Sequence, residues 1–273
     1  MLPCAEGSTA APVPLCLEAL CHNVPMKSER TKAEGAPRTG PRTKSMSRAG
    51  ENYLLSLAIL HEDGVAPHIS QLASYLRHIP EGEEVGTTLA SVSGMIQRLA
   101  KEGLLEMTKE KQIVLTPAGE KRACDVVRRH RLSERLLVDV LDVPLERAES
   151  EAHALEHAIS PGLLERIEEK LGFPDTCPYG RPIYRDGEVV LRRDEPGTSR
   201  LSDAKANTAY VVTRIPDEDF PLLQYLVKNH ILPGQRISVE DVATYRGVVD
   251  LARNGEKLSL GMDVADRIRI KPA

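Results

Sequence analysis

The chain has 273 residues, a formal net charge of −4, 28% charged residues and 41% apolar ones. This length allows two or three modest domains with hydrophobic cores of their own, and the composition is that of a soluble globular protein. No apolar run approaches the roughly 20 residues that span a membrane, and the acidic balance argues against indiscriminate binding of nucleic acid. The five cysteines include no CxxC pair, which favours a reducing, cytoplasmic location.

The first 45 residues contain six Pro and three Gly and show no sustained helical or strand periodicity. Such a composition is typical of disorder, so we interpret residues 1–45 as a disordered leader. An alternative interpretation is that translation starts at Met46, immediately before the first well-patterned helix.

Residues 46–121 have the pattern of a winged helix-turn-helix. Apolar spacing predicts helices over residues 51–61, 69–76 and 91–102. Two short strands, at residues 104–107 and 112–116, then flank a basic turn and predict a hairpin. The connection at residues 78–88 is unusually long and carries three acids, so we expect it to loop away from phosphate.

In a winged helix-turn-helix, the third helix enters the DNA major groove while neighbouring basic groups hold phosphates. Residues 85–135 hold ten Lys/Arg against six Asp/Glu, a local charge of +4. The expected base-facing residues are Ser91, Ser93, Gly94 and Gln97. The expected phosphate partners are Arg98, Lys101, Lys109 and Lys111. The alternative is a metal-independent winged helix that binds another protein.

The next segment carries the residues with metal chemistry. Helices are predicted over residues 120–141, 149–159 and 163–171. Four side chains that can ligate a metal share one face of the second of these helices: Glu149, His153, Glu156 and His157. His130 and Glu134 stand one turn apart on the first and can face that group. This set suits a divalent metal; the alternative is a charged helix face with incidental histidines.

Several blocks, taken in order, resemble the diphtheria-toxin-repressor family of metal-dependent transcriptional regulators. They are residues 51–54, 92–105, 115–119, 126–137, 151–157 and 177–183. The resemblance implies a mainly α, multidomain fold: a winged helix-turn-helix (46–121), a helical metal-binding and dimerisation domain (122–184), a linker (185–204) and a C-terminal SH3-like barrel (205–273). Short strands expected over residues 209–215, 236–240, 247–251, 257–260 and 267–270 resemble ferrous-transport-type SH3 modules.

The resemblance also implies two metal sites and no catalytic residue. The principal site would take His153, Glu156 and His157, with a contribution from Asn52. The other site would take His130, Glu134 and Glu149, with Asp219 from the barrel. The chain departs from the family at the principal site, because His153 stands where other members have Cys or Glu and Asn52 where they have Met or Asp.

Two imidazoles and a carboxylate, without thiolate or thioether, suit several divalent metals. We expect Fe(II), with Mn(II) next and Zn(II) possible. The resemblance implies a homodimeric repressor that binds a palindromic DNA operator and controls metal-uptake genes, and no membrane association. The rival interpretation is a metalloenzyme, because His153-x-x-Glu-His157 also matches an inverted zinc-protease signature and two His with a carboxylate match an iron-oxygenase triad.

Overall fold

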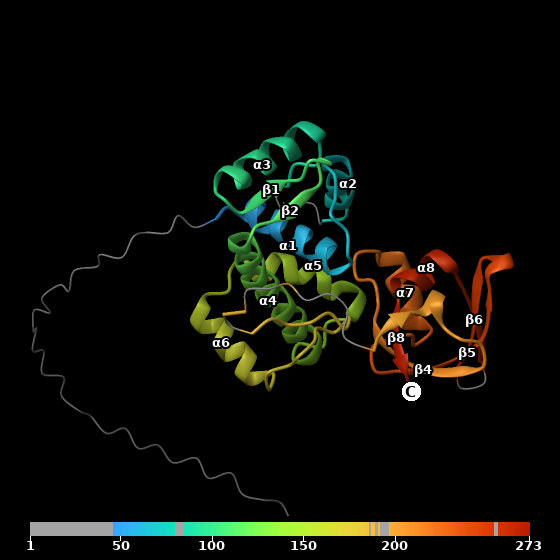
Figure 1. The fold of residues 1–273 in the computed structure, drawn as a ribbon. Helices are drawn as coiled ribbons and strands as arrows, with labels where there is room; N and C mark the ends of the chain where they lie inside the picture. The colour runs from blue at the N-terminus through green and yellow to red at the C-terminus, as the bar shows by residue number, and fades with distance from the viewer. Residues whose placement is uncertain (1–45, 80–84, 186, 189–190, 192–196, 254–255) are drawn as a thin grey trace, which may run out of the picture. The chain divides into compact units, whose positions relative to one another are not determined.

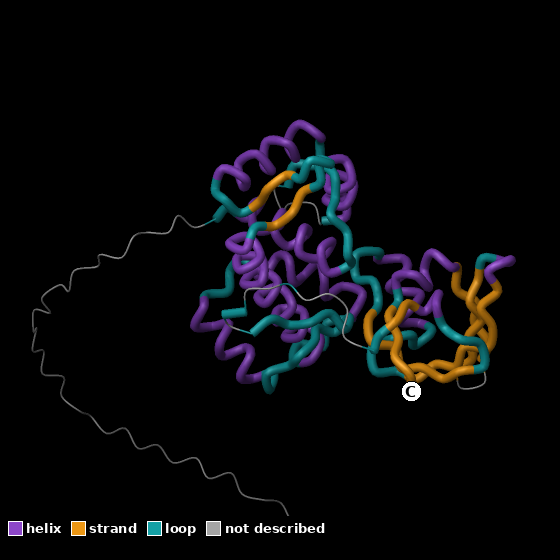
Figure 2. Tube along the Cα trace, in the orientation of Figure 1, coloured by secondary structure: helices purple, strands orange, loops and turns teal. Residues whose placement is uncertain are grey.

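The computed structural model describes residues 46–273 except 80–84, 186, 189–190, 192–196 and 254–255 (Figure 1). The predicted leader, residues 1–45, and part of the long connection at residues 78–88 lie outside the described residues. Strands gather in the C-terminal third, whereas the preceding part is helical apart from one hairpin (Figure 2). Among the described residues, no helix is both long and apolar enough to cross a membrane.

Three helices and a hairpin open the described chain. They are α1 (Arg48–Glu62), α2 (Ile69–Tyr75) with the 3-10 turn η1 (Leu76–His78), α3 (Leu89–Lys101), β1 (Leu105–Met107) and β2 (Ile113–Leu115). Ser47 and Thr88 begin α1 and α3, because each side chain accepts a hydrogen bond from a main-chain amide of the first turn. The strands pair antiparallel, with Leu105 opposite Leu115. The predicted winged-helix order is confirmed.

An aliphatic core holds this module together. Leu54, Leu72, Val92 and Leu99 are all buried within it, as the helical spacing of these apolar residues requires. Gly119 fixes the hairpin against the following helix: a Cβ at this position would lie 2.0 Å from the carbonyl oxygen of Leu104. Only glycine permits this approach without moving the backbone.

The helical domain consists of α4 (Pro117–Asp139), α5 (Leu145–Glu156) and α6 (Pro161–Lys170). Helix α4 contacts α1, α5 and α6, so it is buried on several sides and encloses polar side chains as well as apolar ones. The three predicted helices are confirmed. Helix α5 begins earlier than the sequence indicated and ends at Glu156, so His157 is its C-cap residue.

The C-terminal part is an antiparallel six-stranded sheet in the order β3-β8-β4-β5-β6-β7. The strands are β3 (Ser199–Arg200), β4 (Thr208–Arg214), β5 (Arg236–Ala243), β6 (Val248–Arg253), β7 (Glu256–Gly261) and β8 (Arg269–Pro272). Bulges after Val212 and Val239 bend the sheet around its core. Val212, Val239 and Ile270 are fully buried there. The five predicted strands are confirmed.

The structure adds elements that the sequence analysis did not predict. Helix α7 (Phe220–Lys228) follows β4, helix α8 (Met262–Arg267) precedes β8, and the 3-10 turns η2 (Leu201–Asp203) and η3 (Thr244–Arg246) follow β3 and β5. Ser199 and Arg200 were expected in the linker, whereas the structure pairs them with Ile270 and Arg269 of β8. A two-residue strand is too short to show periodicity, which is why the pattern missed it.

A buried ion-pair network surrounds the end of α1. Glu62 receives two hydrogen bonds from the Arg131 guanidinium, at 2.8 and 2.6 Å, and one from the Tyr184 hydroxyl at 2.6 Å. Burial lowers the pKa of Arg131, but Glu62 outweighs it and the pKa stays above its usual value. This bidentate pair fixes α1 to α4 and to the segment after α6.

Arg181 extends this network to the neighbouring acids. Its guanidinium lies 3.0 Å from Asp217, 3.3 Å from Asp63 and 3.5 Å from Glu62. Arg214 of β4 also pairs with Asp63. Burial raises the pKa of Asp63, but Arg181 and Arg214 outweigh it and hold the pKa below its usual value. Asp63 is therefore ionised and paired with both arginines.

Candidate metal centre

A buried cluster of imidazoles and carboxylates lies where α4 and α5 pack together. Of the residues that the structure describes, His130, His153 and Glu156 each place one ligand atom within 4.8 Å of the other two. All three side chains are buried. The rings of His130 and His153 lie 4.7 Å apart between centroids. This is the proximity that a shared cation requires.

Carboxylates flank both rings. His130 Nδ1 lies 2.8 Å from Glu156 Oε2 and its Nε2 lies 3.1 Å from Glu134 Oε1. On the second ring, His153 Nε2 lies 3.0 Å from Glu149 Oε1, one helical turn earlier. The two groups that the sequence analysis assigned to separate sites are therefore connected through Glu156.

Helix α1 contributes a carboxylate that the sequence analysis did not assign. Glu51 Oε2 lies 2.9 Å from His157 Nδ1 and 3.0 Å from Arg129 Nη2. Burial raises the pKa of Glu51, but the hydrogen bond from His157 and the charge of Arg129 outweigh it and lower the pKa. His157 Nε2 in turn lies 3.4 Å from Glu156 Oε1. Asn52, the next residue of α1, is fully buried.

The residues present fit a divalent metal. Glu156 Oε1, His153 Nδ1 and Glu134 Oε2 are buried and make no hydrogen bond. Buried polar atoms are rarely left in this state, because each loses its hydration without compensation. A cation would satisfy them, and a donor set of imidazoles and carboxylates suits Fe(II), Mn(II) and Zn(II).

The pKa of His130 also indicates that the cluster suits a cation. Burial lowers its pKa, but the carboxylates of Glu156 and Glu134 outweigh burial and raise the pKa well above its usual value. The surrounding carboxylates therefore favour a positive charge at this ring, as they would favour a bound cation. Metal binding to His generally displaces such a proton.

The barrel places a different acid beside the cluster from the one the sequence analysis named. Asp219 caps α7, accepting a hydrogen bond from Leu222 N at 3.1 Å, and lies 3.4 Å from Arg267. Its neighbour Glu218 lines a small cavity together with Glu149 and His153. Burial and the charge of Asp217 raise the pKa of Glu218.

The size of this cavity bears on the enzyme interpretation. Its volume is about 20 Å³, which is enough for about one water molecule. A metalloprotease needs an open metal position beside a cleft that admits a peptide. The cavity described here admits no such substrate.

The predicted DNA-facing residues lie mostly on the exposed surface of α3 and the hairpin. The exposed residues are Ser91, Gly94, Gln97, Arg98, Lys101, Lys109 and Lys111, whereas Ser93 is half-buried. Ser91 Oγ donates to the Thr88 carbonyl oxygen at 2.9 Å, and Arg98 pairs with Glu102 at 3.2 Å. Both contacts are at the surface, so water or a phosphate can replace them.

A winged helix next to a buried cluster of metal-ligating residues defines a metal-responsive transcriptional regulator. The family profile described as "Iron dependent repressor, metal binding and dimerisation domain" matches residues 116–185, and the FeoA domain profile matches residues 199–272. Together with 32% identity over 231 residues to one such repressor, these matches show that the chain belongs to the iron-dependent repressor family.

The chain is similar to known repressors along most of their length. The chain is 32% identical over 231 residues to the iron-dependent repressor IdeR of Mycobacterium tuberculosis, covering 81% of this chain and 96% of that protein. It is 28% identical to the diphtheria toxin repressor of Corynebacterium glutamicum, covering 84% and 98%. A manganese-dependent transcriptional repressor in complex with manganese has a similar structure, with a TM-score of 0.71, 29% identity and coverage of 82% and 100%. These relatives are transcriptional regulators and not enzymes.

Proposed function

We propose that this chain is a homodimeric repressor that binds a palindromic DNA operator when Fe(II), or secondarily Mn(II), occupies the cluster, and that it controls metal-uptake genes. The observation that carries the proposal is the buried cluster of His130, His153 and Glu156 with its unsatisfied carboxylate and imidazole atoms. In this proposal, residues 46–121 bind DNA and residues 122–184 bind metal and dimerise. The similar proteins are themselves metal-dependent repressors, which supports the same activity.

The contacts of α1 support coupling between metal and DNA. Helix α1 belongs to the DNA-binding module, yet Glu51 and Asn52 lie at its start and Glu51 contacts His157 beyond α5. A bound ion would favour the arrangement in which these elements meet. A ligand that binds one arrangement better shifts the population toward it.

Exposed apolar side chains support the dimer. At the end of α4, Val140 and Leu141 are 40% and 57% exposed, and Leu163 on α6 is 50% exposed. A symmetric contact between two copies of the chain would bury these apolar side chains away from water. The two recognition helices of a dimer then meet successive major grooves about 34–36 Å apart.

Metal identity follows from the donor set within this proposal. The proposed ligands supply only imidazole nitrogen and carboxylate oxygen. They are His153, Glu156, His157, His130, Glu134 and Glu149. Raw affinity of such sites rises from manganese through iron to zinc, so availability decides which metal acts. We favour Fe(II), because imidazole is a softer ligand than a carboxylate.

Operator affinity measured anaerobically with Fe(II), Mn(II) and Zn(II), beside a peptidase assay with the same metals, tests the function. We expect metal to raise operator affinity by at least about tenfold, a shift of about 1.4 kcal/mol. Equal DNA binding with and without metal would support a metal-independent module instead. Metal-dependent peptide cleavage would support the enzyme.

The hairpin should contact phosphate. Lys109→Ala and Lys111→Ala are each expected to flatten the log-log salt dependence of operator binding by up to about one, because each phosphate contact releases about one counterion. The measurement is operator affinity across a salt series with metal in excess. Lys205→Ala, which removes an exposed lysine of the barrel, is the matched control. Slopes equal to the parent's would remove the hairpin from the interface.

Glu218, and not Asp219, is expected to support the metal centre from the barrel. Glu218→Gln should weaken metal binding by about three- to tenfold, because Glu218 lines the cavity beside Glu149 and His153 and a carboxylate near the ion stabilises it. Asp219→Asn, which keeps the size of the helix cap, is the control and should leave metal affinity unchanged. Direct metal titration by calorimetry distinguishes the two. If Asp219→Asn weakens metal binding and Glu218→Gln does not, Asp219 is the barrel residue that supports the metal centre.

A further inference from the structure

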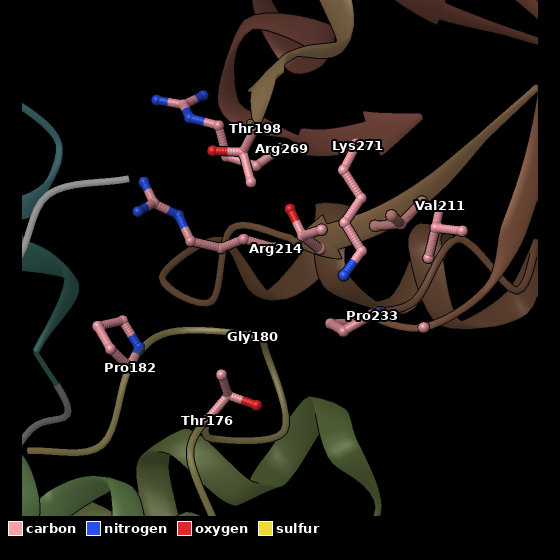
Figure 3. A pocket seen from close by; sticks show the side chains of 12 residues that line it. Thr176, Gly180, Pro182, Thr198, Val211, Arg214, Pro233, Arg269 and Lys271 are labelled. Atoms are coloured by element: carbon pink, nitrogen blue, oxygen red, sulfur yellow. The ribbon is translucent and has the colours of Figure 1, made fainter. Parts of the chain in front are cut away.

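A second pocket, separate from the metal cluster, lies between the barrel and the segment after α6. Its volume is about 210 Å³, which is below the roughly 300 Å³ at which drug-sized sites begin. Figure 3 shows Thr176 and Gly180 of that segment on one side, and Arg214, Arg269 and Lys271 of the sheet on the other. The pocket therefore has room for a small ligand, and most of its charged wall comes from β4 and β8.

The strand pattern explains why cations gather on this wall. Successive residues of a strand point to opposite faces of the sheet. On β8, Ile270 is fully buried in the barrel core, so Arg269 and Lys271 on either side of it face outward. Lys271 is exposed, whereas Arg269 is only 6% exposed. One wall thus carries a buried and an exposed cation two residues apart.

The β-bulge places a polar side chain in the same wall. The register of β4 and β8 shifts between Val212 and Arg214, which makes Thr213 the extra residue. Bulges commonly re-aim a side chain. Thr213 lines the pocket, and its Oγ1 is buried and makes no hydrogen bond. Because the enclosed Oγ1 touches no solvent, it would donate to a ligand in the pocket only after the side chain rotates about χ1.

The opposite side of the pocket is held close to the bulge. A Cβ on Gly180 would lie 1.9 Å from the carbonyl oxygen of Thr213, and Gly180 has a φ of +89°. Ile215 N also donates to Tyr179 O at 3.0 Å. These contacts fix the segment against β4, so the pocket is a built feature of the fold.

The charge of the pocket lining indicates that its ligand is an anion. Among the lining residues that the structure describes, three are cationic, three are threonines and none is acidic. Arg214 also pairs with Asp63 outside the lining, which leaves the local balance positive. Guanidinium, ammonium and hydroxyl groups are the donors that phosphate oxygens accept from.

We propose that this pocket binds a small anion of the phosphate class, with Lys271 and Thr213 as its direct donors and Arg269 supplying a buried positive charge. The ligand is inorganic phosphate or a small phosphate monoester, which the volume accommodates. Binding would join the barrel to the segment after α6 and so stabilise the contact between them.

The test is calorimetric titration of the metal-free full chain with inorganic phosphate and, separately, glycerol phosphate, at constant ionic strength set with chloride. We expect saturable binding of at least one anion. Lys271→Ala should weaken it about tenfold, the loss expected for one charge-assisted hydrogen bond. Thr213→Val, which keeps the side-chain shape, should weaken it about threefold. Lys205→Ala, the same charge change elsewhere on the barrel, should leave it unchanged.

The two anions distinguish the sources, because tighter binding of glycerol phosphate assigns the pocket to a phosphate monoester. Far-ultraviolet circular dichroism checks that each variant is folded. The proposal is overturned if neither anion binds saturably, or if Lys271→Ala binds as tightly as the parent. It is also overturned if Lys271→Ala lowers operator affinity and its salt slope without any binding of free anion, because the pocket would then contact DNA phosphate.

Discussion

His153→Ala is expected to leave a folded protein whose operator affinity no longer rises with metal. His153 lies between Glu149 and Glu156 and its Nδ1 makes no hydrogen bond, so its removal costs the cluster a ligand. Loss of a residue that merely supports a ligand costs about 10- to 100-fold in metal affinity, and loss of the ligand itself should exceed about 100-fold. Metal titration followed by operator binding measures both effects.

Replacement variants make the assignment sharper. His153→Cys should retain activation and shift preference toward softer metals, whereas His153→Glu should shift it partly toward Mn(II). His61→Ala, a histidine of α1 outside the cluster, is the control and should respond to metal as the parent does. If His153→Ala also responds as the parent does, the proposed metal centre is wrong.

Glu62→Gln is expected to destabilise the protein by about 3 kcal/mol or more, because removing one partner of a buried ion pair leaves the other charge uncompensated. Glu62 is the shared acceptor of Arg131 and Tyr184, and its side chain is only 1% exposed. The midpoint of urea unfolding of the metal-free protein is the measurement. Arg131 cannot lose its proton to escape the cost, since a guanidinium stays charged in proteins.

The control for this variant is Glu151→Gln, which breaks the exposed pair with Arg147 on α5. Surface pairs contribute about 0–1 kcal/mol, so its midpoint should barely move. A small effect of Glu62→Gln, comparable with the control, would mean that water reaches the network and that it does not fix α1 in place.

Much of the candidate site could be predicted from the sequence, because the residues that mark it lie close together along the chain. Glu149, His153 and Glu156 follow one another at helical spacing, so their common face could be read from the chain. His130 and Glu134 are likewise one turn apart, and the structure joins them to α5 through Glu156. Periodicity also predicted the winged helix and five strands of the barrel.

The parts that escaped prediction depend on contacts distant along the chain. Glu51 meets His157 across a separation of 106 residues, and nothing in either segment marks the other as its partner. Glu218 and Asp219 are adjacent acids, and only the start of α7 decides which one faces the cavity. The unpaired hydroxyl of Thr213 follows from a bulge, which has no sequence pattern of its own here.

Because helix α4 is long, a small change in its tilt at the metal cluster becomes a larger displacement of the hairpin. It is a single helix of 23 residues that starts directly after the hairpin and carries His130 in its middle. At about 1.5 Å per residue, roughly 20 Å of rigid rod separates His130 from the start of the helix. Gly119 lets the start of α4 pack directly against the backbone of Leu104, which precedes the hairpin. A tilt of about 5° at the cluster would therefore move the hairpin by about 1.7 Å, which is enough to lengthen a phosphate hydrogen bond beyond its working range.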